Sequence, residues 1–242
     1  MTYAWNLGYP RIGLRRELKK ATEGYWKGAV SEDGLRKTCA ALRKEHWLAQ
    51  KDAGLDLVPV NDFSLYDQVL DASALVGAVP ARYKWSGNDV DIDTYFAMAR
   101  GAQREGLDVK AMEMTKWFDT NYHYIVPEFT KGQAFKLSSK KLFDEFEEAK
   151  ALLGAERVKV NLVGPVSFVL LGKAKEEGVA PLRDVLPKVV EVYKEVLGKL
   201  AAAGATWAQF DEPCFVQDRT AEEMEALKKT YAELAKMKGA CK

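Results

Sequence analysis

The sequence predicts an α/β fold built from parallel (βα) units that form an incomplete barrel. Three observations support this prediction. Short runs of β-branched and aromatic residues alternate with longer stretches of helical periodicity, the runs are apolar at nearly every position, and each ends in turn-forming residues. A length of 242 residues, of which 48% are hydrophobic and 29% charged, is typical of a globular chain with its own core.

Five runs are predicted to form the parallel strands. A closed TIM barrel has eight strands and typically about 250 residues. Because only five runs are found in 242 residues, we expect about five of the eight βα units, and a sixth strand would begin at residues 239–242. An open sheet leaves an unpaired edge strand, which would favour self-association. The five runs span residues 3–8, 55–60, 122–126, 158–164 and 206–211.

Helices are predicted between the strands from apolar spacing and end signals. The first follows residues 3–8 and places Leu14, Leu18, Ala21 and Tyr25 on one apolar stripe. The second begins after the N-cap residue Ser31 and ends at Gly54. An insertion is predicted at about 62–121, with helices at 65–75 and near 93–100. Three further helices are predicted: 140–153 after Ser139, a long helix from Pro181 to Gly204, and an amphipathic helix from Thr220 to about Met237.

Composition excludes several classes of protein. Lys and Arg number 36 and Asp and Glu 35, so the net charge of +1 argues against a protein that binds nucleic acid or a membrane surface through bulk charge. Three cysteines and two distant histidines form no metal-binding pattern. The sequence starts without a basic leader and has no apolar run long enough to span a bilayer. We expect a cytoplasmic protein without a metal site.

Residues 11–20 carry the strongest local chemical signal, five positive charges against one negative. On the predicted helix, Arg15, Arg16 and Lys19 lie opposite the apolar stripe. The start of the helix also opens toward the carboxyl ends of the strands, where ligands bind in such folds. Guanidinium groups bind carboxylates in a bidentate manner, so this face would suit a ligand with several carboxylates. The alternative is an ordinary solvated helix face.

Two further segments are candidate sites. Aromatic residues surround Lys116 before the third predicted strand and would suit a flat heterocycle, with His123 nearby, although the residues alone favour core aromatics at a strand entry. Asp211 and Glu212 lie at a strand end, a position that is catalytic in many barrels. Consecutive strand residues point to different sides, however, and an Asp-Glu-Pro sequence is also a common strand terminator.

The segments LGYPRIGLRRELKK, MTKWFDTNYHY, NLVGPV and FDEP begin at residues 7, 114, 161 and 210. Together they resemble the cobalamin-independent methionine synthases, over the length of this chain but only over the amino-terminal part of those longer enzymes. The resemblance implies two face-to-face (βα)₈ barrels, without cobalamin. It also implies methyl transfer from 5-methyltetrahydropteroyltri-L-glutamate to homocysteine to form methionine, with zinc and homocysteine in a carboxyl-terminal catalytic barrel that these 242 residues do not include.

The resemblance also assigns residues. It implies no catalytic residue and no metal ligand here, since Cys39, Cys214 and Cys241 match none of the family's zinc ligands, and the chain alone is expected to be inactive. Alternatives are a stand-alone module that binds folate or docks on a separate carboxyl-terminal chain, and a different enzyme on a related barrel, such as a decarboxylase of the uroporphyrinogen type. The implied substrate-binding residues are Arg16, Glu17, Leu18, Lys19 and Lys116, with Arg15, His123 and Asp211 as secondary candidates.

Overall fold

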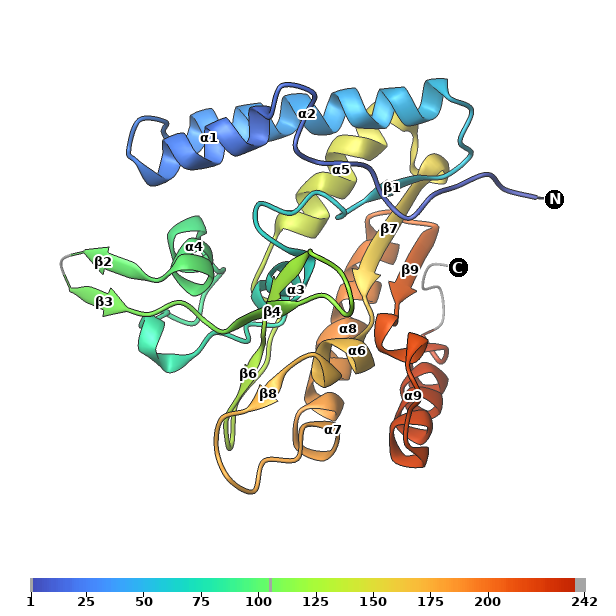
Figure 1. Cartoon of the computed structure of the whole chain (residues 1–242). Helices are drawn as coiled ribbons and strands as arrows, with labels where there is room; N and C mark the ends of the chain where they lie inside the picture. Colours follow the sequence, from blue (N-terminus) through green and yellow to red (C-terminus); the bar gives the residue numbers. More distant parts are fainter. Residues whose placement is uncertain (1, 105, 238–242) are drawn as a thin grey trace.

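The computed structural model describes residues 2–104 and 106–237, and its centre is a parallel sheet of three strands (Figure 1). The strands follow the order β1 (Val58–Val60), β7 (Val158–Val163) and β9 (Trp207–Asp211). All six residues of β7 are buried, as expected for a central strand with both faces covered. These strands lie within three of the predicted runs and confirm the α/β class.

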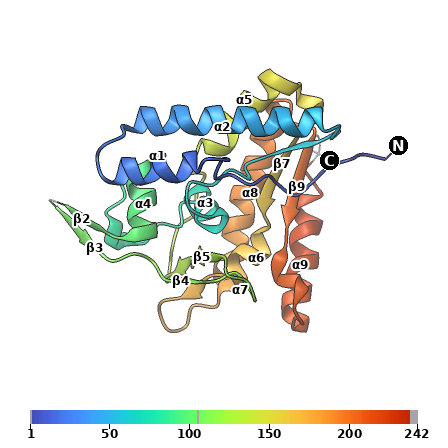
Figure 2. The ribbon, with the colours of Figure 1, turned by 45° about the horizontal axis from the view of Figure 1, so that its top comes forward.

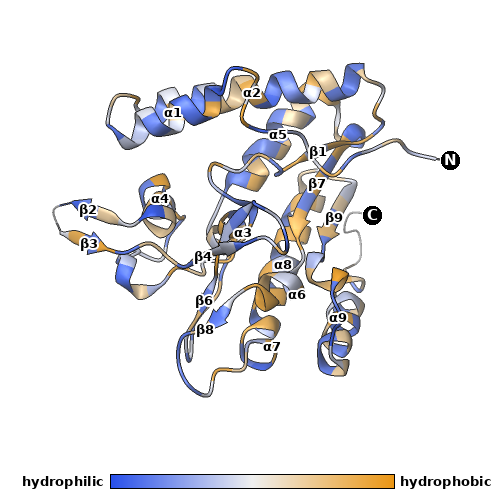
Figure 3. Ribbon diagram, in the orientation of Figure 1, coloured by the Kyte–Doolittle hydropathy of each residue, from blue (hydrophilic) through white to orange (hydrophobic). Residues whose placement is uncertain are grey.

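Helices cover one face of this sheet. Helix α5 (Lys141–Leu153) packs on β1 and β7, and α2 (Glu32–Asp52) crosses β1 and α5. Helix α8 (Leu186–Ala202) packs against α6 (Pro165–Leu170). Along α2 and α8, hydrophobic positions recur between hydrophilic ones (Figure 3), so each helix turns one side to the protein and the other to solvent. A hydrophobic core joins the valines of β1 and β7 to α5 and α8.

The other face of the sheet is polar and is crossed by residues 3–9. Lys159 of β7 donates from Nζ to Asn6 O at 2.9 Å, and Asn161 donates from Nδ2 to Leu7 O at 2.7 Å. The prediction of a buried strand at 3–8 is wrong in this respect. In place of a strand, the segment forms an isolated bridge between Trp5 and Leu57, and the Leu7 side chain is 67% exposed. Polar bonds to its backbone, rather than burial of its side chains, hold the segment in place.

Between β1 and α5 the chain forms a series of small elements that extends from the left of Figure 1 to its centre. Part of this region packs with helix α1 (Glu17–Trp26) and α2 around a second core that includes Leu18, Leu42 and Met98, whereas Tyr124 and Phe129 lie in the core around the sheet. In order, the elements are α3 (Gln68–Leu75), η1 (Ala81–Tyr83), α4 (Ile92–Arg100), the hairpin of β2 (Ala102–Arg104) and β3 (Leu107–Val109), the hairpin of β4 (Met114–Lys116) and β5 (His123–Ile125), and β6 (Glu128–Phe129), which pairs with β8 (Lys173–Ala174).

The predicted strand at 122–126 is β5, but its place in the parallel sheet is wrong. β5 runs antiparallel to β4, with Lys116 opposite His123. A partner a few residues away in the chain costs little loop-closure entropy, whereas apolar character alone does not indicate which strand will pair. Among the described residues the parallel sheet therefore has three strands and forms no closed barrel. The expected start of a sixth strand at 239–242 lies outside the described residues.

Most helix ends follow the predicted signals. Ser31 caps α2 by accepting from Gly34 N at 3.1 Å, and Thr220 forms a capping box at α9 (Ala221–Leu234). The long helix from Pro181 is instead α7 (Pro181–Asp184) followed by α8, and α6 was not predicted at all. The remaining elements are the short helices η2 (Ala155–Arg157) and η3 (Pro213–Val216).

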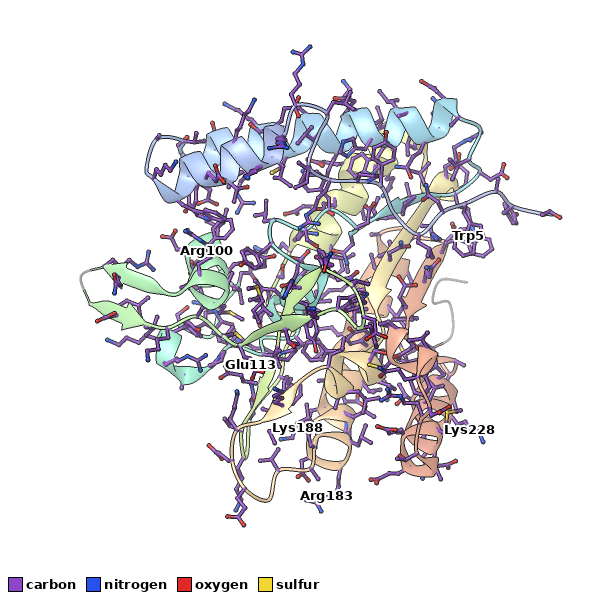
Figure 4. All side chains as sticks on the ribbon, in the orientation of Figure 1. Trp5, Arg100, Glu113, Arg183, Lys188 and Lys228 are labelled. Carbon is purple, nitrogen blue, oxygen red and sulfur yellow. The ribbon has the colours of Figure 1, made fainter. Side chains whose placement is uncertain are left out.

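Helix α1 begins three residues later than the apolar stripe predicts. Leu14, which the stripe placed on the buried face, is 95% exposed, whereas Leu18 is 2% exposed. Helices α1 and α2 pack side by side, as Figure 2 shows. At the far end of α1, the guanidinium carbon of Arg100 lies 3.7 Å from the centre of the Trp26 ring, and Figure 4 shows Arg100 on α4 below the α1 helix.

Candidate functional site

The segment before α1 is folded into a tight turn by its own backbone. Gly13 has φ +82° and Arg16 φ +62°, and Arg16 N donates to Gly13 O at 3.1 Å. A Cβ at Gly13 would lie 2.9 Å from Leu42 Cδ2, so both the conformation and the space favour glycine here. Arg16 has no such freedom, and a left-handed conformation costs a non-glycine residue about 1–2 kcal/mol.

Four exposed cations surround the start of α1, namely Arg15, Arg16, Lys19 and Lys20, here called the α1 cations. Arg16 occupies the N-cap position, and no side chain caps the helix. The helix dipole therefore adds to the positive potential of these side chains. Lys19 lies 3.7 Å from Glu23, an exposed pair that contributes little stability.

Two of the predicted substrate-binding residues have structural roles in the same turn. Leu18 is buried in the second core, and its N–H donates to Ile12 O at 3.1 Å. Glu17 Oε2 accepts from Arg15 N at 2.9 Å. Hydrogen bonds from its own N–H and that of Arg15 lower the pKa of Glu17, which keeps the carboxylate ionised at neutral pH. Of the residues assigned to this segment, Arg16 and Lys19 present exposed charges.

The second candidate segment forms the β4–β5 hairpin. Lys116 and His123 face each other across it and are both exposed, and His123 Nδ1 lies 3.0 Å from Asn121 O. Trp117 and Phe118 stack edge to face at 5.1 Å and pack against the core around the sheet. These two aromatic side chains are partly buried and pack against that core. Tyr122, at the end of the loop, is partly exposed.

One side chain connects the two segments. Arg11 donates from Nη2 to Tyr66 O at 2.6 Å, and its guanidinium carbon lies 6.0 Å from the centre of the Tyr122 ring. Arg11 belongs to the turn that precedes α1, and Tyr122 is the neighbour of His123 in the hairpin. The structure thus links the cationic turn to the hairpin that carries Lys116.

Asp211 and Glu212 point to different sides of the sheet end, as strand geometry predicts. Asp211 accepts from Gln209 Nε2 at 2.6 Å and lines a cavity of about 50 Å³ at the carboxyl ends of the strands, together with Asn61 and Asp62. Burial raises the pKa of Asp62, although it accepts a hydrogen bond from Tyr9 N. A cavity of this volume has room for little more than one or two waters.

A buried ion network beside this cavity was not predicted. Lys141 Nζ lies 3.3 Å from Asp71 Oδ2, 3.2 Å from Glu145 Oε1 and 3.1 Å from Asn61 Oδ1. Burial acts to lower the pKa of Lys141, but the charges of Glu145 and Asp71 outweigh burial and raise it. Lys141 and Glu145 are four residues apart on α5, and this spacing was the only available signal. The network ties α5 to α3 and to the end of β1.

The described part of the chain shows neither a cluster of metal ligands nor a membrane-spanning helix. Residues 2–104 and 106–237 contain no group of three or more His, Cys, Asp or Glu residues placed to hold a metal ion. No helix within them is both long and apolar enough to cross a membrane. Cys39 and Cys214 are buried free thiols.

Comparison with known proteins gives one consistent family. A sequence model described as the cobalamin-independent synthase N-terminal domain matches residues 3–242. The chain is 56% identical over 240 residues to a 5-methyltetrahydropteroyltriglutamate–homocysteine methyltransferase of Salinibacter ruber, in a match that covers 97% of this chain and 31% of that protein. The proteins of the same name from Cytophaga hutchinsonii and Flavobacterium johnsoniae are 50% and 52% identical, with 96% and 95% of this chain matched to 30% and 29% of theirs.

A solved structure shows the same fold. The putative vitamin-B12 independent methionine synthase of Listeria monocytogenes superposes with a TM-score of 0.64 at 16% sequence identity, over 98% of this chain and 62% of that chain. The sequence relatives are much longer than this chain, which spans less than a third of their length.

Proposed function

The chain belongs to the cobalamin-independent synthase family through its N-terminal domain, and on this premise we propose that it binds the glutamate tail of 5-methyltetrahydropteroyltri-L-glutamate. The sequence relatives are named for methyl transfer from this folate to homocysteine. In the proposal, these 242 residues supply affinity and orientation for the methyl donor. The rest of a longer enzyme supplies the site at which methionine is formed.

The observation that carries the proposal is the group of α1 cations. Among the described residues, Arg15, Arg16 and Lys20 take part in no ion pair, and the pair of Lys19 with Glu23 is long and exposed. A triglutamate tail presents several carboxylates along a flexible chain. Guanidinium groups bind such carboxylates through paired N–H donors, and the uncapped start of α1 adds a favourable dipole.

The turn before α1 and the β4–β5 hairpin would share the ligand. We expect Arg16 and Lys19 to bind carboxylates at the turn, and Lys116 to bind a further one from the hairpin, with Arg15 and His123 as secondary contacts. Leu18 would anchor the turn rather than bind the tail, because its side chain is buried and its N–H donates to Ile12 O. Glu17 would act by shaping the turn, because its carboxylate accepts the Arg15 N–H. Asp211 lies in the separate small cavity at the strand ends and would not reach the tail directly.

The described residues do not fit a zinc site. The resemblance implies a zinc-bound homocysteine, but the described residues offer no donor set of three or more suitable side chains. In the proposal, the residues that bind and activate homocysteine belong to the rest of the longer enzyme. We therefore expect the chain alone to lack methyltransferase activity.

We also propose how this chain fits into a longer enzyme. The sheet β1–β7–β9 would be part of an amino-terminal (βα) barrel, with residues 62–121 as an insertion and a carboxyl-terminal barrel as the partner that completes the enzyme. If this partner is missing, the open sheet edge would favour self-association. The free thiols of Cys39 and Cys214 fit the reducing conditions of the cytoplasm.

Titration calorimetry tests the proposal on the 242-residue chain. We expect Arg16→Ala and Lys19→Ala each to weaken binding of 5-methyltetrahydropteroyltriglutamate about tenfold, since each removes a charge-assisted contact. Added salt should weaken binding to the unmodified chain. Arg157→Ala, which removes an exposed arginine of η2, is the matched control. Unchanged affinity in both variants would refute the role of the α1 cations.

A further inference from the structure

The two groups of candidate contacts rest on different parts of the protein. Leu18 anchors the start of α1 in the second core, together with Leu42 of α2. Trp117 and Phe118 anchor the β4–β5 loop against the core around the sheet. Ile125 of β5 also lies in the second core with Leu18, so the β4–β5 hairpin contacts both cores. A ligand that contacts both Arg16 and Lys116 would therefore depend on the relative position of the start of α1 and the β4–β5 loop.

Arg11 is placed to fix this relative position. Its Nη2 donates to Tyr66 O at 2.6 Å, and its guanidinium carbon lies 6.0 Å from the centre of the Tyr122 ring. Tyr66 is itself held, because its N–H donates to Tyr95 Oη at 3.2 Å and the Tyr95 hydroxyl donates to Asp71 at 2.6 Å. The Arg11 side chain therefore joins the turn to the hairpin from an anchored backbone position.

The planar shape of arginine matters for this contact. A guanidinium can lie over an aromatic ring and donate to a carbonyl oxygen at the same time, whereas the point charge of lysine cannot reproduce both interactions. Arg11 is half-buried, and its Nε is buried without a hydrogen-bond partner among the described residues. Its guanidinium is thus directed mainly to Tyr66 and Tyr122 rather than to solvent.

We infer that Arg11 is a positioning residue that sets the spacing between the α1 cations and Lys116, and thereby the preference of the site for a long glutamate tail. This inference rests on the proposed function. A monoglutamate can use one of the two groups, and its binding does not depend on their spacing. A triglutamate uses both groups, so it gains from a fixed spacing, because fewer degrees of freedom are lost on binding.

Calorimetry with two probes tests the inference, namely 5-methyltetrahydropteroyl triglutamate and monoglutamate. For Arg11→Ala we expect the triglutamate to bind about tenfold more weakly while monoglutamate binding is unchanged. Tyr122→Leu should have the same effect, and the double variant should lose no more than either single variant, because both remove one contact. Arg157→Ala controls for the loss of a guanidinium elsewhere.

Hydrogen exchange gives a second readout that a merely structural role would not change. In the unmodified chain the triglutamate should protect amides in residues 12–20 and 114–124 together, and in Arg11→Ala it should protect one segment without the other. If Arg11→Ala does not fold, Arg11→Lys and Tyr122→Leu carry the test. Unchanged selectivity, or an equal loss for both probes, would overturn the inference. If Arg16→Ala and Lys19→Ala do weaken binding in that case, the proposed function stands and only the positioning role fails.

Discussion

Tyr231 donates a hydrogen bond of 2.8 Å to Oε1 of Glu212, which ties helix α9 to the end of strand β9. The same carboxylate accepts from Val166 N at 3.2 Å and Ser167 N at 2.6 Å, at the start of α6. Glu212 thus joins three elements, while Asp211 lies on the opposite side at the small cavity. Of these two adjacent carboxylates, Glu212 therefore has a structural role.

Replacing Glu212 tests this role. We expect Glu212→Ala to lower the free energy of unfolding by about 2–3 kcal/mol, because buried donors lose their acceptor. Glu212→Gln should cost less, since it resembles the protonated carboxyl that burial favours by raising the pKa of Glu212. Urea denaturation measures both, with Asp211→Asn as the matched control. An equal cost for Asp211→Asn and Glu212→Ala would contradict the assignment.

The sequence predicted correctly those helix starts that depend on a capping residue a few positions away. Ser31 and Thr220 cap α2 and α9 because a side-chain oxygen close in the chain accepts the free N–H groups. The strand pairing of β5 could not be predicted in this way, since it depends on a choice between a local and a distant partner. The prediction for residues 3–8 failed for a similar reason, because a run of apolar residues does not show whether its faces will be covered.

The candidate site likewise has features that depend on neighbouring residues, which the sequence predicts, and features that depend on distant ones, which it does not. The cluster of charges in residues 11–20 is visible in the sequence, and the structure keeps Arg16 and Lys19 exposed. The burial of Leu18 and the use of Glu17 in the turn follow from where α1 begins, which a left-handed Arg16 decides. The network around Lys141 draws on α3, α5 and the end of β1, so no window of sequence contains it.

A pair of leucine variants tests the start of α1. Leu18→Ala should lower the free energy of unfolding by about 2–5 kcal/mol, because it leaves a cavity in the second core. Leu14→Ala should change it by less than about 0.5 kcal/mol, because Leu14 is exposed. Denaturant titrations of the two proteins make the comparison. Similar costs would mean that both leucines are buried, as the apolar stripe alone predicts.

Lys159 gives the chain a pH-dependent signal. Its Nζ lies 3.8 Å from the centre of the Trp5 ring, and burial lowers the pKa of Lys159 from 10.5 to about 8, against the opposing charges of Asp211 and Asp62. Figure 4 shows Trp5 at the edge of the molecule near the N-terminus. Because loss of the ammonium charge removes the cation–π contact, Trp5 fluorescence should change with a midpoint near pH 8.

The same shift predicts the direction of the stability change. Between pH 8 and 10.5 the unfolded chain holds the Lys159 proton more tightly than the folded chain, so the contribution of this group makes the protein more stable as pH rises through that window. Denaturation at several pH values measures this contribution as the difference between the unmodified chain and Lys159→Met. The fluorescence step should be absent in Trp5→Phe and in Lys159→Met. A step that persists in both variants would assign the signal to another tryptophan.

Removal of the Lys141 charge should lower the free energy of unfolding far more than removal of the Lys140 charge. Lys141→Met removes the cation nearest to Asp71 and Glu145 and leaves Glu145 only the longer pair with Arg43 at 3.7 Å, which we expect to cost about 3–5 kcal/mol. Lys140→Met breaks only an exposed pair with Asp89 and should cost less than about 1 kcal/mol.

The cost of Lys141→Met should also depend on pH. Burial raises the pKa of Glu145, so the loss of stability in Lys141→Met should shrink at acidic pH as the buried carboxylates take up protons. Urea midpoints at pH 5 and pH 7.5 test both statements, and a deficit independent of pH would show that lost packing, rather than uncompensated charge, explains the cost.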